Sequence, residues 1–271
     1  RAVDRATEGV NAMGKQGLVG AERRKTILRM VQESGSASVA QLCATLGVSA
    51  ATIHRDLAAL AKEGVVERVH GGILAPAGGA DDPHVLGEKA HRRGEKAEIA
   101  RTALSFVSPE VHSVFLEAST TVAQLGLLLR ERRGLVFLTN SPEIALELVA
   151  EGLEVTLVGG QLRARTLATV GPDANRQIGL SRVDVAFIGV SAIDVDGLSS
   201  MNAIEAETKT AIIAASRAVI ALGDHSKLGK RGLAHVARAD AINALVTDAR
   251  ADDAAVEALR SCGLEVIIAE G

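Results

Sequence analysis

The chain has 271 residues, of which 47% are hydrophobic and only 1% aromatic, and its formal net charge is −3. This length suits one small and one medium domain with aliphatic cores, and the scarcity of aromatic side chains argues against base-stacking platforms for single-stranded nucleic acid. No apolar run approaches the roughly 18 residues that span a bilayer, and the first ten residues lack the apolar core of a signal peptide, so we expect no membrane segment.

The first part of the chain is predicted to form a small helical domain over residues 21–74. Residues 1–20 show no hydrophobic pattern and are expected to be a mobile arm. A first helix is predicted over residues 22–33. A second begins at Ser38, whose hydroxyl forms a capping box with Gln41, and it ends at Gly47. A third helix then begins at Ser49.

The third helix is amphipathic, with Ile53, Leu57 and Leu60 predicted to form its buried stripe. Small and hydrogen-bonding side chains occupy the opposite face and its flanks, and they suit a helix that lies in the major groove of DNA. These are Ala51, Thr52, His54, Arg55, Ala58 and Lys62. A short strand over residues 65–69 and the turn at residues 70–72 complete a predicted winged helix-turn-helix.

Charge is consistent with this interpretation, because residues 1–75 hold 10 basic and 7 acidic side chains although the whole chain is acidic. Two short amphipathic helices joined through Gly-Val also occur in ordinary bundles, so the pattern alone leaves that alternative open.

The stretch VSAATIHRDLAALAKEGVVERVHGG resembles the N-terminal domain of the DeoR family of bacterial transcription regulators. The resemblance implies binding to double-stranded operator DNA. The residues that it assigns to DNA are Ser49, Ala51, Thr52, His54, Arg55, Lys62, Arg68 and His70. The family usually has two consecutive arginines where this chain has His54 and Arg55, so the operator sequence stays open.

A linker is predicted over residues 75–87, which are rich in Ala, Pro, Gly and Asp. From residue 88 to 271, helical stretches alternate with short apolar runs, and the first helix is expected over residues 88–107. The apolar runs are residues 111–116, 135–139, 155–158, 183–189, 218–222, 242–246 and 264–268. Buried strands with crossover helices predict an α/β domain with a mainly parallel sheet covered on both faces.

Ligands of such sheets bind at the carboxyl ends of the strands. Ser119, Thr120 and Thr121 follow the first apolar run and open a helix, where they form either a phosphate cradle or an ordinary cap. Asn140 follows the second run and is expected to face the crevice. Gly159-Gly160 ends the third run, where the two glycines allow either a close approach to the backbone or a tight turn.

Later strand ends carry Ser191, Asp194, Asp224 and Lys227. Their mixture of cation, hydroxyl and carboxylate groups suits a phosphorylated polyol.

The segments LEASTT, LTNS, VGG, GPDA, DVAFIGVSAID and DHSKLGK look like the DeoR-type C-terminal sensor domain, whose fold is similar to ribose 5-phosphate isomerase. The resemblance implies a phosphorylated sugar or related metabolite as effector. It assigns as contacts Ser119, Thr120, Thr121, Asn140, Ser191, Asp194, Glu205, Lys209, Asp224 and Lys227. Glu205 and Lys209 are four apart on a predicted helix and equally fit a surface ion pair. Glu117-Ala118 departs from the family pattern, and the added methyl group of Ala118 leaves room for an atypical effector.

The sequence therefore leaves three hypotheses for the function. The first is a ligand-gated repressor of a sugar or polyol operon, which works as a homodimer or homotetramer on paired half-sites. The second is an isomerase-like enzyme using Asp194, Glu205, Asp224 and Lys227. The third is a domain that only oligomerises. Cys43 and Cys262 indicate neither zinc nor a disulfide; we expect a cytoplasmic protein without metal ion, cofactor or catalysis.

Overall fold

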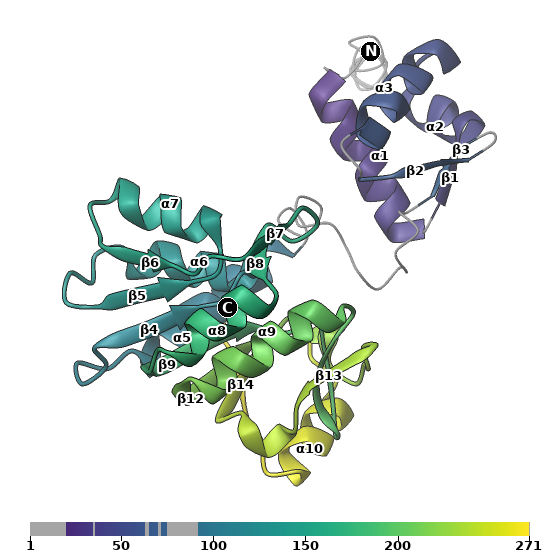
Figure 1. The fold of residues 1–271 in the computed structure, drawn as a ribbon. Coiled ribbons are helices and arrows are strands. Elements are labelled where there is room, and N and C mark those ends of the chain that lie inside the picture. Colours follow the sequence, from purple (N-terminus) through teal and green to yellow (C-terminus); the bar gives the residue numbers. More distant parts are fainter. Residues whose placement is uncertain (1–19, 35, 63–64, 70–71, 75–91, 271) are drawn as a thin grey trace, which may run out of the picture. The chain divides into compact units, whose positions relative to one another are not determined.

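The computed structural model describes residues 20–34, 36–62, 65–69, 72–74 and 92–270. The chain divides into two compact units, Arg1–Gly87 and Glu88–Gly271 (Figure 1). Each is described by itself below.

The first unit is a winged helix-turn-helix, as predicted. Its elements are α1 (Gly20–Ser34), β1 (Ser36–Ser38), α2 (Val39–Leu46), α3 (Ala50–Lys62), β2 (Glu67–Val69) and β3 (Gly72–Leu74). The capping box between Ser38 and Gln41 is present, and Gly47 ends α2 in the left-handed conformation. The sequence did not predict β1, which pairs with β3 in an antiparallel sheet of order β1-β3-β2. Gly72 permits this pairing because a Cβ there would collide with the carbonyl oxygen of Ala37.

An aliphatic core joins the three helices to the wing. Its buried members are Ile27, Val31, Ala37, Leu42, Ile53, Leu57, Leu60, Val65, Val66 and Ile73. The predicted stripe of α3 is therefore the inner face of that helix, and the remaining face is left outside the core.

The second unit is an α/β domain with a seven-stranded, wholly parallel sheet of order β15-β14-β12-β9-β4-β5-β6. Its sheet strands are β4 (Ser113–Leu116), β5 (Val136–Thr139), β6 (Val155–Leu157), β9 (Val183–Gly189), β12 (Ser216–Leu222), β14 (Ala244–Asp248) and β15 (Glu265–Ala269). Its helices are α5 (Arg93–Ala103), α6 (Thr120–Leu129), α7 (Pro142–Ala150), α8 (Pro172–Gly179), α9 (Ala203–Ala214) and α10 (Asp253–Ser261), with the short 3-10 turns η1 (Leu104–Phe106), η2 (His225–Lys227) and η3 (Ala239–Ala241). This confirms the predicted fold class.

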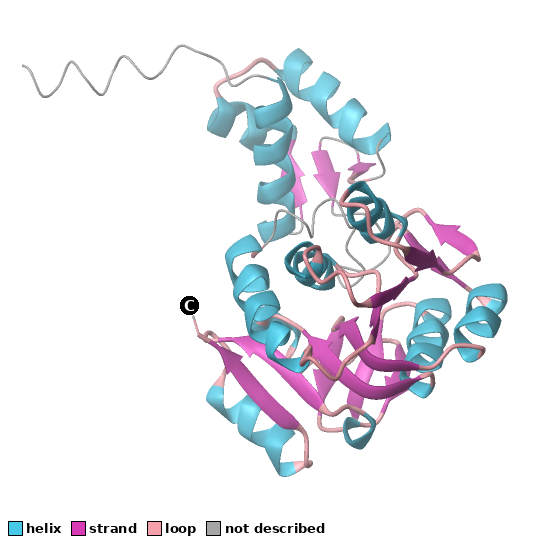
Figure 2. Ribbon diagram, turned by 90° about the vertical axis from the view of Figure 1, so that its left-hand side faces the viewer, coloured by secondary structure: helices cyan, strands magenta, loops and turns pink. Residues whose placement is uncertain are grey.

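Helices lie on both sides of the sheet (Figure 2). Two apolar cores fill the space between the helices and the sheet. On one face α5, α6 and α7 contribute buried side chains such as Ile99, Leu125 and Leu148. On the other, α8, α9 and α10 contribute Ile178 and Ile212 among others. Side chains alternate between the faces because successive residues of a strand point to opposite sides.

Several details differ from the sequence prediction. The helix expected over residues 88–107 is α5 followed by η1, and residues 88–91 lie outside the described part. Two small antiparallel sheets were not predicted: β7 (Gln161–Arg163) with β8 (Ala168–Val170), and β10 (Ala192–Asp194), β11 (Gly197–Ser200) and β13 (Ala234–Ala237). Among the described residues, no helix is both long and apolar enough to cross a membrane.

Candidate nucleic-acid interface and effector site

Helix α3 presents a polar face that the rest of the first unit, the head domain, does not cover. Ala51, His54, Arg55, Ala58 and Lys62 are exposed. Thr52 is half-buried on the flank of this face. The small residues let the helix approach another molecule closely, and the long or ring side chains between them carry hydrogen-bond donors. This is the composition that base edges in a major groove require.

The beginning of α3 is fixed by two hydroxyl groups. The Ser49 Oγ atom accepts a hydrogen bond from the Thr52 backbone N–H at 3.3 Å and lies 3.0 Å from Thr52 Oγ1. Ser49 is exposed. Its hydroxyl therefore caps the helix on the side from which a recognition helix enters a groove.

Asp56 is a residue of this motif that the sequence reasoning missed. It lies on the inner side of α3 and is 4% exposed. Its Oδ2 atom accepts a hydrogen bond from Arg23 Nε of α1 at 2.5 Å, and Arg24 Nη1 lies 3.6 Å from Oδ1. This ion pair fastens α3 to α1 and so sets the angle of the exposed face. The sequence contained one signal of this role, namely a carboxylate beside the apolar residues of the α3 stripe.

Two further residues, Arg68 and His70, are assigned to DNA. Arg68 is the central residue of β2, where it pairs with Ile73 of β3. His70 lies outside the described residues.

In the second unit, β4 and β9 are neighbours in the middle of the sheet, with three strands beyond β9 on one side and two beyond β4 on the other. The chain thus reverses its direction of strand addition between them. Crevices at the carboxyl ends of open parallel sheets form at such a switch point. Glu117 follows β4 directly, and Gly189 ends β9.

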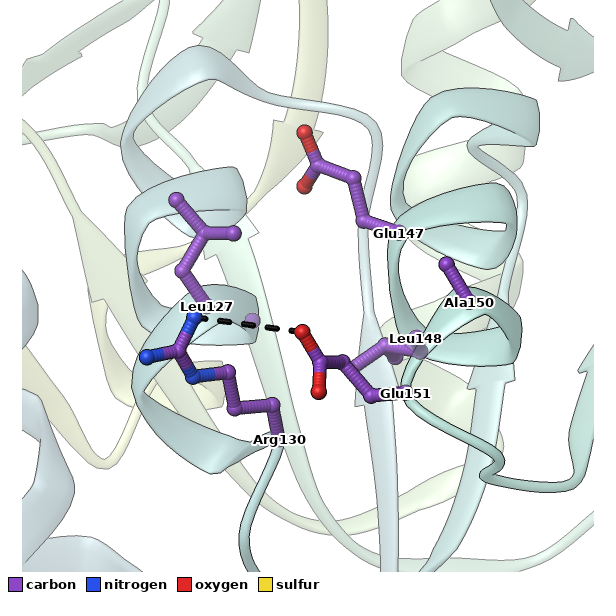
Figure 3. A pocket seen from close by; sticks show the side chains of 7 residues that line it. Leu127, Arg130, Glu147, Leu148, Ala150 and Glu151 are labelled. Carbon is purple, nitrogen blue, oxygen red and sulfur yellow. Dashed lines mark ion pairs between the residues drawn. The ribbon is translucent and has the colours of Figure 1, made fainter.

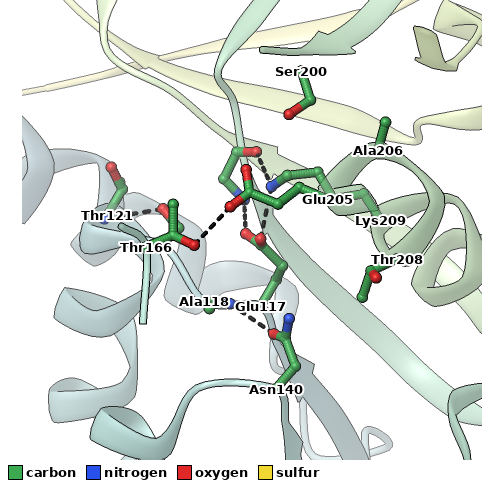
Figure 4. A network of polar contacts seen from close by, with 12 residues as sticks. Glu117, Ala118, Thr121, Asn140, Thr166, Ser200, Glu205, Ala206, Thr208 and Lys209 are labelled. Atoms are coloured by element: carbon green, nitrogen blue, oxygen red, sulfur yellow. Dashed lines mark hydrogen bonds and ion pairs between the residues drawn. The ribbon is translucent and has the colours of Figure 1, made fainter. Parts of the chain in front are cut away.

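A buried ion pair occupies this switch point (Figure 4). Lys209 Nζ, from α9, lies 2.8 Å from Glu117 Oε1 and donates to the Gly189 carbonyl oxygen at 2.8 Å. The Gly189 N–H in turn donates to Glu117 Oε2 at 2.9 Å. Burial raises the pKa of the Glu117 carboxyl, and the ammonium group of Lys209 opposes the rise without cancelling it. Lys209 is thus an interior residue and not half of a surface pair with Glu205.

The turn after Glu117 is built as a helix start. Ser119 is half-buried and accepts a hydrogen bond from the Thr121 N–H at 3.2 Å, so it caps α6. Thr120 is half-buried and Thr121 is buried. Gly189 packs so closely against this turn that a Cβ there would collide with the side chain of Ser119. A helix N-terminus such as the start of α6 suits an anion.

Asn140 takes a different place from the one expected. Its side chain is 1% exposed, accepts from the Ala118 N–H at 2.9 Å and donates to the Thr169 carbonyl at 3.1 Å. Both ends of the amide are thus engaged with backbone. This favours a structural role, in which Asn140 ties the turn after β4 to strand β8.

Glu205, at the start of α9, contacts the β7–β8 hairpin. Its Oε1 atom accepts a hydrogen bond from Thr166 Oγ1 at 2.6 Å (Figure 4). The same oxygen lies 3.0 Å from Arg163 Nη1. The carboxylate of Glu205 also raises the pKa of Glu117, so the two acids are near enough to interact. The sequence reasoning assigned no role to Arg163 or Thr166.

One strand further along the sheet, Asp224 follows β12 and is buried. It accepts hydrogen bonds from the N–H and Oγ of Ser226 at 3.0 and 2.5 Å, and Arg92 Nη1 lies 3.5 Å away. Burial by itself raises the pKa of Asp224, but the Ser226 hydrogen bonds and the charges of Lys227 and Arg92 together hold it below its ordinary value. Lys227 is half-buried.

The remaining predicted contacts are less closely tied to this crevice. Ser191 is half-buried just after β9, and Asp194 of β10 accepts a hydrogen bond from Arg231 Nε at 2.9 Å. The three acids of the isomerase alternative thus have separate basic partners: Arg231 for Asp194, Arg163 for Glu205 and Arg92 for Asp224. Among the described residues, no group of three His, Cys, Asp or Glu side chains is arranged to hold a metal ion.

A separate hollow of about 210 Å³ lies between α6 and α7 (Figure 3). Its lining residues are Gly126, Leu127, Arg130, Glu147, Leu148, Ala150 and Glu151. Arg130 Nη1 and Glu151 Oε1 face each other across it at 3.9 Å. None of the residues predicted to bind an effector lines this hollow.

Comparison with protein-family models gives two matches. Residues 23–77 match the DeoR-like helix-turn-helix domain, and residues 91–249 match the DeoR C terminal sensor domain. The sensor match alone spans more than half of the chain.

Curated relatives resemble the chain along most of its length. The HTH-type transcriptional regulator GlpR of Haloferax volcanii is 34% identical over 249 residues, which cover 91% of this chain and 97% of the relative. The Glycerol-3-phosphate regulon repressor of Escherichia coli (strain K12) is 33% identical over 230 residues, covering 84% and 90%. Among solved structures, ribose 5 phosphate isomerase A from Neisseria gonorrhoeae is 16% identical, covers 49% of this chain and 52% of its own, and has a TM-score of 0.35.

Proposed function

The chain belongs to the DeoR family of transcriptional regulators, and from that premise we propose that it is a cytoplasmic repressor whose hold on operator DNA is set by a phosphorylated sugar or polyol. The observation that carries the proposal is the pairing, in one chain, of an uncovered polar face on α3 with a polar cluster at the switch point between β4 and β9.

On the DNA side, we assign base contacts to Arg55 and His54, and phosphate contacts to Lys62 and to Arg68 of the wing. Ala51 and Ala58 allow close approach, and Ser49 and Thr52 lie at the helix start. Base contacts supply specificity, and phosphate contacts supply most of the affinity and its dependence on salt. One helix in one groove binds weakly, so we assign a homodimer or homotetramer that occupies paired half-sites.

On the effector side, we place the anionic group of the ligand at Ser119, Thr120 and Thr121, where α6 begins and its N-terminus favours negative charge. We place the polyol portion beside Glu205 and beside Lys209, whose ammonium group is held by Glu117. Ser191, Asp224 and Lys227 are assigned to the neighbouring strand ends. The name of the Escherichia coli relative, a glycerol-3-phosphate regulon repressor, supports a small phosphorylated polyol as the first compound to examine.

Effector control requires that the ligand bind the DNA-competent and DNA-incompetent arrangements with different affinity, typically by about 1–3 kcal/mol. The separate basic partners of Asp194, Glu205 and Asp224 favour this sensing role over the isomerase alternative, because each acid is neutralised where it lies. A domain that only oligomerises needs no buried Glu117–Lys209 pair at its crevice.

The proposal is tested by fluorescence anisotropy with DNA from the upstream region of its own gene, with and without sn-glycerol 3-phosphate, ribose 5-phosphate and fructose 6-phosphate. We expect a rise in anisotropy on DNA binding at low salt, with a DNA affinity that one of these compounds changes by about 5-fold to 150-fold. Failure to bind the upstream DNA at low salt would contradict the repressor role. Binding that no phosphorylated compound alters would favour the oligomerisation alternative.

A further inference from the structure

The β7–β8 hairpin is firmly held at its base. The Thr169 N–H donates to the Asn140 carbonyl at 2.8 Å, and Thr169 Oγ1 donates to the Val158 carbonyl at 2.6 Å. Thr169 is buried. The base of the hairpin is therefore part of the rigid body of the domain, joined to the ends of β5 and β6.

The far end of the hairpin is held by Glu205. Arg163 Nη1 and Thr166 Oγ1 both contact the same carboxylate oxygen, Oε1, at 3.0 and 2.6 Å. Among the described residues, Oε2 of Glu205 receives no hydrogen bond, so this oxygen is left for another donor. The exposed fractions of the Arg163 and Glu205 side chains are 19% and 13%.

An ion pair this far removed from water is costly to separate unless both charges find new partners. A neutral polyol offers hydroxyl groups but no negative charge to replace the carboxylate beside Arg163. Inorganic phosphate offers oxygens to Arg163 but leaves Glu205 facing an anion. A molecule with a phosphate and a hydroxyl group a few bonds apart satisfies both charges at once.

Resting on the function proposed above, we infer that Arg163 and Thr166 are effector-binding residues that select for a hydroxyl and a phosphate on the same small molecule. On binding, Glu205 exchanges Arg163 for the ligand hydroxyl, and Arg163 turns to the phosphate held at the first turn of α6. The Glu205–Arg163 pair thereby sets the selectivity of the crevice against free phosphate and against unphosphorylated polyols.

The test is isothermal titration of the full chain, without DNA, with sn-glycerol 3-phosphate, glycerol and inorganic phosphate. Wild-type protein should bind sn-glycerol 3-phosphate at least about 100-fold more tightly than either fragment. Arg163→Ala should weaken that binding by about 30-fold or more, the usual scale for removing one side of a desolvated charge pair. Arg176→Ala is the matched control, because the one ion pair that Arg176 makes within the described part of the chain is with exposed Asp173 on α8.

A second variant should strengthen the binding of one probe, inorganic phosphate. Glu205→Gln keeps the shape and the hydrogen bond from Thr166 but removes the charge that holds Arg163, so inorganic phosphate should bind about 5-fold to 10-fold more tightly than to wild type. A hairpin that merely supports the fold would not produce this gain. Equal affinity of Arg163→Ala and wild type, weaker phosphate binding by Glu205→Gln, or no binding of any of the three probes would each overturn the inference. The titration measures ligand binding without DNA, whereas the anisotropy assay measures DNA affinity. Ligand binding in the titration with no change of DNA affinity in the anisotropy assay would contradict the proposed function alone.

Discussion

Lys209 and Glu117 form an ion pair of 2.8 Å between α9 and the end of β4, with exposed fractions of only 7% and 6%. Both also bond the backbone of Gly189 at the end of β9. Three segments that are distant in sequence are thus joined at the point where the sheet reverses its strand order. The pair holds the floor of the proposed effector crevice in place.

Lys209→Met should lower the free energy of unfolding of the larger domain by about 3–5 kcal/mol, because it leaves the Glu117 carboxylate buried without its cation. Urea denaturation followed by circular dichroism measures the change. The double variant Glu117→Gln/Lys209→Met should recover a large part of the loss, since no charge then remains buried. A double variant as unstable as the sum of the two single variants would contradict the pairing as the cause.

Asp56→Ala should destabilise the head domain by about 2–4 kcal/mol, because Arg23 loses the partner that fastens α1 to α3. The variant should also lose operator binding while it keeps effector binding in the larger domain. Thr26→Ala on α1 is the control, since the Thr26 hydroxyl donates to the Glu22 carbonyl of its own helix. Normal operator affinity in Asp56→Ala would show that the pair does not set the position of α3.

The fold was largely predictable because periodicity and strand length are local signals. The stripe of Ile53, Leu57 and Leu60 and the seven apolar runs follow directly from spacing. Asp56, Glu117 and Arg163 were missed because their partners lie far along the chain, and local patterns carry no information about such pairing. The hairpins β7–β8 and β10–β11 were missed because their strands have only three or four residues and no continuous apolar run marks them.

The same limit explains Asn140. An asparagine after a strand is typical of a residue that faces a ligand, and the sequence contains no sign that Ala118 and Thr169 would claim both ends of its amide. Lys209 shows the converse case, because its four-residue spacing from Glu205 fits a surface pair, whereas tertiary packing turns it inward toward Glu117.

Gly189→Ala should weaken the binding of sn-glycerol 3-phosphate and lower the stability of the larger domain by about 1–3 kcal/mol, because the new methyl group would push Ser119 out of the turn that opens α6. Calorimetric titration and thermal unfolding measure the two effects. Gly179→Ala is the control: it lies at the end of α8 with open space around it and should be neutral or slightly stabilising. Unchanged ligand affinity in Gly189→Ala would argue against the Ser119 turn as the anion site.

Asp224→Asn should make stability depend less on pH in the acid range. Because the folded-state pKa of Asp224 lies below its ordinary value of 3.8, its carboxylate stabilises the fold above that value, and the contribution is lost as pH falls through the folded-state pKa. The urea midpoint of wild type should therefore exceed that of Asp224→Asn at pH 7, and the gap should narrow below about pH 4. Asp173→Asn on α8 serves as the exposed control. A gap that stayed constant from pH 7 to pH 3 would show that the charge of Asp224 is not what stabilises the fold.

Arg55→Ala and Lys62→Ala should weaken operator binding in two distinguishable ways. Arg55 lies in the middle of the exposed face of α3, where a guanidinium reads a base edge, so its loss should cost about 1–3 kcal/mol on operator DNA and much less on random DNA. Lys62 lies at the end of the helix, and its loss should weaken both DNAs alike and reduce the slope of log affinity against log salt by about 1. Anisotropy titrations at several KCl concentrations separate the two, with Arg176→Ala as a variant remote from α3 in sequence. If Arg55→Ala weakened operator and random DNA equally, Arg55 would be a phosphate contact, and the sequence preference would have to come from His54 or Thr52.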